Sequence, residues 1–194
     1  GGDDYSNLYD SAGNDRFVMN ANAATLTTGS YQINVEGISR INAFSTRGSD
    51  SVVMNGTSGD EFFNHENGVS IVSGADFTSY AKGFANVAVH SGGGSDFGQV
   101  IDTTGNDQFE STAGDTVMRS QNLLVSTDGF KQVNLIARNG GYDTATLTGT
   151  NREDVVLADV DSSRLKMSNG QTTRVVGMDE TSIDMGGGLD LGFM

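Results

Sequence analysis

The sequence predicts an all-β fold of the solenoid type, a right-handed parallel β-helix, for three reasons. A Gly-x-Asp triplet recurs at intervals of 46, 46, 47 and 47 residues, which is typical of a structural repeat. Short segments with alternating apolar and polar residues lie between clusters of Gly, Asn, Asp and Ser, as strands lie between turns. No stretch shows a sustained helical period, so helices are not expected.

The repeat divides the chain, which we interpret as a single domain of residues 1–194. Four copies occupy 1–47, 48–93, 94–140 and 141–187, and a fifth begins at 188–194. A glycine followed by an apolar residue marks each copy at Gly37, Gly83, Gly129 and Gly177. Two apolar columns keep the same register, namely Phe17, Phe63, Phe109, Val156 and Leu8, Met54, Val100, Leu147. Because one coil cannot bury its own apolar face, these columns predict ladders stacked from copy to copy.

Each copy is expected to contain about four strands. In the first copy the expected strands are residues 5–9, 16–21, 31–35 and 38–44. The second of these directs Phe17 toward the core. The third and fourth strands show apolar–polar alternation. Ile33 and Val35 share one face of the third strand, and Ile41 and Ala43 share one face of the fourth.

A shorter spacing suggests the path of the chain. Gly13 and Gly37 are 24 residues apart, and Gly37 and Gly59 are 22 apart. We interpret these glycines as one corner on successive coils, which predicts about two coils in each repeat and eight in the four copies. A β-propeller built from four-stranded blades is the alternative fold for a repeat of this length.

Composition limits the partners. The formal net charge is -14 and the sequence pI is near 4.2, which disfavours nucleic acid and anionic membranes. With no cysteine, disulfides and thiolate metal sites are excluded. No apolar run is long enough to span a membrane, so membrane insertion is not expected. The chain opens on GGDD, without an initiator Met or a signal peptide, and we interpret it as a piece of a longer chain or a processed product.

Two acidic columns, offset by 11 residues, are the candidate metal ligands. They are Asp4, Asp50, Asp96 and Asp143, and Asp15, Glu61, Asp107 and Asp154. Calcium prefers carboxylate and carbonyl oxygens, so a calcium site is one interpretation. The other is structural, because Asp and Asn in turns bond their own backbone. The segments AGNDRF, SGDEFF and TTGNDQF resemble the calcium-binding nonapeptide repeat of the RTX type, and that resemblance implies calcium as a cofactor.

Catalytic candidates are sparse, and the chain is expected not to be an enzyme. His65 and His90 have no equivalents in the other copies, so both are interpreted as structural. Asp102 and Asp107 have the character of a glycosidase carboxylate pair, but Asp10 and Asp15 repeat their spacing, which favours a turn. A polysaccharide-binding or -cleaving β-helix remains an alternative, with platforms for sugar rings at Tyr5, Tyr9, Tyr80 and Phe97.

The pattern GGxD…LYDSAGNDxF…GF over the whole chain resembles the long repeat arrays of large bacterial surface or secreted proteins. The resemblance implies a structural or adhesive segment of an exported protein, located in the secreted fraction or on the cell surface. Repeat sequence reaches both ends of the chain, so the expected partners are neighbouring repeats of the parent chain or further copies in head-to-tail assembly.

Overall fold

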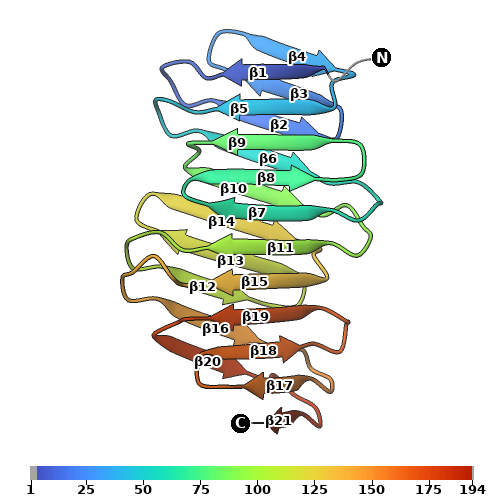
Figure 1. Cartoon of the computed structure of the whole chain (residues 1–194), viewed down its shortest axis with the longest axis vertical. Helices are drawn as coiled ribbons and strands as arrows, with labels where there is room; N and C mark the ends of the chain where they lie inside the picture. Colours follow the sequence, from blue (N-terminus) through green and yellow to red (C-terminus); the bar gives the residue numbers. More distant parts are fainter. Residues whose placement is uncertain (1–3, 194) are drawn as a thin grey trace.

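The computed structural model describes residues 4–193, and every regular element in this range is a β-strand. The strands form two sheets stacked along a rod, which confirms the all-β solenoid class. The strands do not radiate as the blades of a propeller (Figure 1). Within the described residues, no helix is long and apolar enough to cross a membrane.

Each repeat contributes five strands. The first contains β1 (Tyr5–Tyr9), β2 (Arg16–Asn20), β3 (Ala23–Thr27), β4 (Gln32–Glu36) and β5 (Arg40–Phe44). The second contains β6 (Ser51–Asn55), β7 (Phe62–Glu66), β8 (Val69–Ser73), β9 (Thr78–Lys82) and β10 (Asn86–His90). The third contains β11 (Phe97–Ile101), β12 (Gln108–Ser111), β13 (Asp115–Ser120), β14 (Leu123–Asp128) and β15 (Gln132–Ile136). The fourth contains β16 (Thr144–Thr148), β17 (Val155–Ala158), β18 (Ser162–Lys166), β19 (Thr172–Val176) and β20 (Glu180–Asp184), and β21 (Leu191–Phe193) begins the fifth.

Successive repeats exchange the two sheets. One sheet has the order β1-β5-β9-β8-β7-β11-β15-β19-β18-β17-β21, and the other β20-β16-β12-β13-β14-β10-β6-β2-β3-β4. The second to fourth strands of each repeat form an antiparallel unit within one sheet, and the first and fifth strands lie in the other. The chain therefore changes sheet three times per repeat, and because three is odd, equivalent residues of neighbouring repeats lie in opposite sheets.

This path differs from the expected one in three respects. The stack has about five turns rather than eight coils, because three strands of each repeat stay in one sheet. Residues 23–27 form a strand that the sequence interpretation left out. The corners that contain Gly13 and Gly37 lie at opposite edges of the rod, because the first follows β1 and the second precedes β5, which runs parallel to β1. They are therefore not one corner on successive coils.

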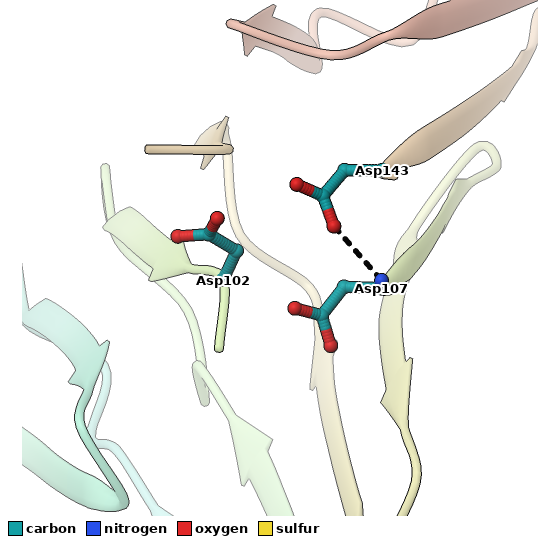
Figure 2. A group of neighbouring side chains, drawn as sticks. All are labelled: Asp102, Asp107 and Asp143. Atoms are coloured by element: carbon teal, nitrogen blue, oxygen red, sulfur yellow. Dashed lines mark hydrogen bonds between the residues drawn. The ribbon is translucent and has the colours of Figure 1, made fainter. Parts of the chain in front are cut away.

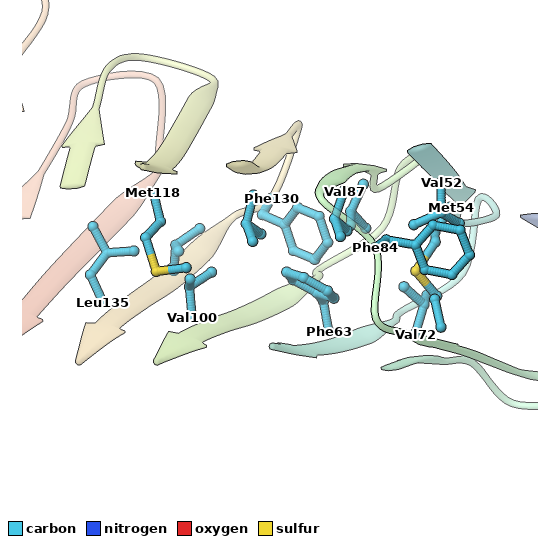
Figure 3. Packing of buried hydrophobic residues seen from close by; sticks show 14 of the residues in the cluster. Val52, Met54, Phe63, Val72, Phe84, Val87, Val100, Met118, Phe130 and Leu135 are labelled. Carbon is cyan, nitrogen blue, oxygen red and sulfur yellow. The ribbon is translucent and has the colours of Figure 1, made fainter. Parts of the chain in front are cut away.

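The core runs continuously between the two sheets and contains the residues of the expected columns (Figure 3). The predicted ladders of equivalent residues are wrong, because equivalent residues lie in opposite sheets: Phe17 on β2 pairs with Val52 on β6 and not with Phe63 on β7. Phe17, Phe63 and Phe109 are at most 1% exposed. The apolar residue after each marker glycine packs on this column: Phe84 meets Phe17 edge-on with ring centroids 5.0 Å apart. Aromatic contacts of this kind contribute beyond the area they bury.

The backbone conformation explains why glycine occupies each marker position. Gly37, Gly83, Gly129 and Gly177 all have φ between +73° and +87°, in the left-handed region that glycine adopts without strain. A Cβ at Gly83 would also lie 2.3 Å from the carbonyl oxygen of Ser45 on the neighbouring turn. The short turns can therefore cross between the sheets close to the next turn of the solenoid.

Candidate functional site

The acidic residues lie in two kinds of loop that connect the sheets. We call residues 10–15, 56–61, 102–107 and 149–154 the first corners, and residues 45–50, 91–96, 137–143 and 185–190 the second corners. Each first corner lies beside the second corner that closes the same repeat. A Cβ at Gly94, for example, would lie 2.0 Å from the carbonyl oxygen of Gly59, so the two backbones are in direct contact.

Each first-corner carboxylate is held by its own loop. The N–H of the Ser or Thr four residues earlier donates to the carboxylate, at 2.5 Å for Ser11–Asp15 and 2.7 Å for Thr103–Asp107. The hydroxyl of the same Ser or Thr donates as well. Glu61 and Asp154 repeat this arrangement. Charge-assisted hydrogen bonds of this kind are stronger than neutral ones, so the acid fixes the corner.

A second set of bonds joins the corners of adjacent turns. The backbone N–H of each first-corner acid donates to the aspartate of the second corner. These bonds are Asp15 to Asp50 at 2.6 Å, Glu61 to Asp96 at 2.6 Å, Asp107 to Asp143 at 2.8 Å and Asp154 to Asp190 at 2.9 Å. The paired acids are 35 or 36 residues apart. The pairs alternate between the two edges of the rod, because successive repeats exchange sheets.

The structure places the eight candidate metal ligands as follows. Asp15, Asp50, Glu61, Asp96, Asp107, Asp143 and Asp154 are all at most 5% exposed. Asp4 is exposed and lies before β1. Acids 11 residues apart, such as Asp4 and Asp15, lie at opposite ends of a strand, about 16 Å of extended chain. The pairs that the structure brings together are those one turn apart.

One trio of carboxylates is closer than the others (Figure 2). Asp102, Asp107 and Asp143 each offer an oxygen within 4.8 Å of the other two, and all three residues are at most 2% exposed. Oδ2 of Asp102 accepts the N–H groups of Arg138 and Asn139, at 2.9 and 2.8 Å. Oδ1 of Asp102 is buried and has no hydrogen-bond partner among the described residues.

Electrostatics disfavour three charges in this place. Burial raises the pKa of Asp143, and the carboxylates of Asp102 and Asp107 raise it further, while the hydrogen bond from the Asp107 N–H opposes the rise. At 4.8 Å and an effective dielectric constant of about 20, two unit charges repel by roughly 3 kcal/mol. The ion pairs of residues 4–193 do not include any of the three. The trio is therefore suited to hold a cation or a proton.

Neither histidine belongs to a cluster of carboxylates like this trio. His65 is 1% exposed, its Nδ1 lies 2.7 Å from the hydroxyl of Ser70, and burial lowers its pKa to about 4. It is a neutral core residue on β7. His90 is exposed at the end of β10, and its Nδ1 lies 2.9 Å from Oδ2 of Asp128.

The aromatic candidates for sugar stacking form ladders across strands. Tyr9 stacks on Phe44 with ring centroids 5.0 Å apart, and Phe44 lies 5.8 Å from Tyr80. Phe97 stacks on Phe62 at 5.6 Å. Tyr5 is 66% exposed. Within the described chain, three of the four candidate rings, Tyr9, Tyr80 and Phe97, thus contact an aromatic neighbour. They form one ladder across β1, β5 and β9 and another across β7 and β11, which stabilises the sheet surface.

Two groups of functional residues were missed from the sequence. The Ser or Thr that precedes each acidic residue by four positions is Ser11, Thr57, Thr103 or Thr150, and this recurring spacing is a usable signal. The second is Asp102, whose spacing from Asp107 predicts a turn and not a metal ligand. It joins Asp143 because the loops lie beside each other, and a column comparison of single repeats does not show this.

A comparison of the chain with protein-family models, with curated proteins and with solved structures finds no match. The fold and the corners define a β-solenoid whose turns are fastened by carboxylates.

Proposed function

We propose that the chain is a non-enzymatic structural segment of an exported bacterial surface or fibre-forming protein. In this role its repeats stack into a rod that serves as a spacer, fibre or adhesive stalk. The proposed location, secreted or on the cell surface, is supported by the resemblance of the repeat array to large exported proteins.

The observation that carries the proposal is that strands of successive repeats pair in the same way along the rod. The strand β21, which begins the fifth copy, pairs in parallel with β17 through the register Val155–Leu191. Two repeats earlier, β11 pairs with β7 in the same way through Phe62–Phe97. Each new copy therefore adds to the rod by the pairing that the previous copies use, as expected for an extendable array.

The opposite end of the rod offers a surface for such an addition. Ile33 on β4 lies opposite Leu26 and faces the interior, yet it is 40% exposed, because β4 is the last strand of its sheet. Edge strands with unpaired backbone groups and apolar residues readily take another strand. A neighbouring repeat of the parent chain, or another copy of this chain, would cover Ile33.

The acidic residues fit a structural role better than a catalytic one. Glu61 and Asp107 are buried and bonded to their own loops, whereas a general acid or base must reach its substrate. His65 is buried in the core.

Sedimentation velocity over a range from micromolar to millimolar protein tests the proposal. We expect association that grows with concentration, and at least tenfold weaker association for Ile33→Lys. Phe62→Lys is the matched control, because Phe62 is 44% exposed on β7, in the middle of its sheet and away from the end strands. A strict monomer at the highest concentration, or equal association of both variants, would contradict the proposal.

A further inference from the structure

The first repeat contains a counterpart of the trio formed by Asp102, Asp107 and Asp143, and there every carboxylate has hydroxyl donors. Oδ1 of Asp10 accepts the hydroxyl of Thr46 at 2.8 Å. Oδ2 of Asp50 accepts the hydroxyl of Ser45 at 2.6 Å. The N–H groups of Thr46 and Arg47 also donate to Asp10, as those of Arg138 and Asn139 donate to Asp102.

The third repeat has lost both hydroxyls. Ala137 stands where the first repeat has Ser45, and Arg138 stands where it has Thr46. As a result, Oδ1 of Asp102 has no hydrogen-bond partner, and water cannot supply one easily because Asp102 is only 1% exposed. Oδ2 of Asp143 likewise has no hydroxyl at position 137 from which to accept a hydrogen bond. Buried polar atoms without partners are rare in native proteins and require an explanation. Oδ2 of Asp96 in the second repeat also has no partner, but Gly56 stands there in place of Asp102, so only two carboxylates meet.

Protein side chains do not supply the missing positive charge. The guanidinium of Arg138 bonds to Glu66, so the nearest cationic side chain along the loop is engaged elsewhere. The remaining ion pairs of the described chain join His90 to Asp128 and Arg119 to Glu110. Three buried carboxylates with a free oxygen and no counter-ion are the donor set that a hard divalent cation prefers.

We propose that Asp102, Asp107 and Asp143 bind one calcium ion in the third repeat, and that the first repeat does not bind calcium because hydroxyls satisfy its carboxylates. The ion would join a first corner to its second corner at one edge of the rod. Ligands separated by up to 4.8 Å fit an ion with oxygen distances near 2.4 Å, and backbone carbonyls and water would complete the coordination. The proposal is independent of the role of the chain in an array.

Isothermal titration calorimetry with calcium chloride, on protein dialysed against a chelator, tests this site. We expect one ion per chain, and a rise in Tm of about 5–10 °C when calcium is 100 times its Kd. The variant Asp102→Asn, whose amide oxygen can still accept the loop N–H groups, should lose this binding. Absence of binding to the unmodified chain would overturn the proposal, and so would full binding by Asp102→Asn.

Two further variants distinguish binding at this site from non-specific binding of calcium to the acidic chain. Restoring both hydroxyls with Ala137→Ser and Arg138→Thr should weaken calcium binding at least tenfold while the protein stays folded in chelator. Asp10→Asn, in the first repeat, is the matched control and should keep one ion with an unchanged Kd. Calcium affinity that survives the restored hydroxyls, or that falls in Asp10→Asn, would overturn the assignment.

Discussion

The pair formed by His65 and Ser70 should make the protein sensitive to acid. The two residues are cross-strand partners on β7 and β8, and both are 1% exposed. In the first repeat the equivalent partners are Met19 and Ala24, which are 0% and 2% exposed. The double variant His65→Met, Ser70→Ala therefore transfers a pair that already packs in this core, and it leaves no buried hydroxyl without a partner.

The magnitude follows from the pKa of His65, which burial lowers from 6.5 to about 4. Below pH 6.5 the unfolded chain binds a proton that the folded core excludes, so stability is present above that pH and is lost down to about pH 4. A difference of about 2.5 pKa units corresponds to roughly 3 kcal/mol. The double variant lacks this loss, so its stability relative to the unmodified protein should improve by roughly 3 kcal/mol between pH 7.5 and pH 4.

Urea denaturation at pH 7.5, 6, 5 and 4 in chelator measures this difference. At pH 7.5 the two proteins should agree within about 1.5 kcal/mol, because the exchange approximately conserves volume. The single variant His65→Met should be less stable than the double one, because it leaves the Ser70 hydroxyl unpaired. Unfolding free energies that stay parallel for the double variant and the unmodified protein over this pH range would refute the reasoning.

Three further predictions concern the corners. Gly94→Ala should destabilise the protein by more than about 3 kcal/mol in urea denaturation, because φ is +87° and the new Cβ would lie 2.0 Å from a backbone oxygen, whereas Gly29→Ala, with open space around it, should stay within about 0.5 kcal/mol. Thr57→Val removes the hydroxyl that donates to Glu61 and should cost about 1–2 kcal/mol in the same assay; no loss would show that the backbone N–H alone holds the corner. The pKa of Asp143 is raised by burial, so the folded state favours its protonated form and its contribution to stability is lost as pH rises; Asp143→Asn should therefore raise Tm at pH 7 in chelator by about 2 °C or more, and a lower Tm would contradict this.

The fold class was predictable because the apolar columns and turn residues repeat in register. Phe17, Phe63 and Phe109 occupy equivalent places in the core, as their spacing predicts. The path within each repeat was not predictable from columns alone. Columns treat equivalent residues as stacked, whereas three sheet crossings per repeat put them in opposite sheets. One local signal was available: Asn67 and Gly68, both with positive φ, form the hairpin between β7 and β8, and Asn-Gly is a strong hairpin signal.

The corner chemistry was predictable in kind but not in its partners. Asp and Asn beside Gly indicate turns that bond their own backbone, and Asp15 and Asp107 do so. That Asp15 lies against Asp50, and not beside Asp4, depends on which loops become neighbours after the chain has passed through the antiparallel unit. Such contacts between adjacent turns follow from topology, which no local pattern encodes.

The central claim is that the acidic corners are fastened by donors of the chain itself, with one cation at the trio. A crystal structure of the protein grown in calcium tests it most directly. The claim predicts Asp15 bonded to Asp50 and Glu61 bonded to Asp96 without an ion, and a single calcium among Asp102, Asp107 and Asp143. Calcium at every acidic corner, or these acids paired 11 residues apart, would contradict the claim.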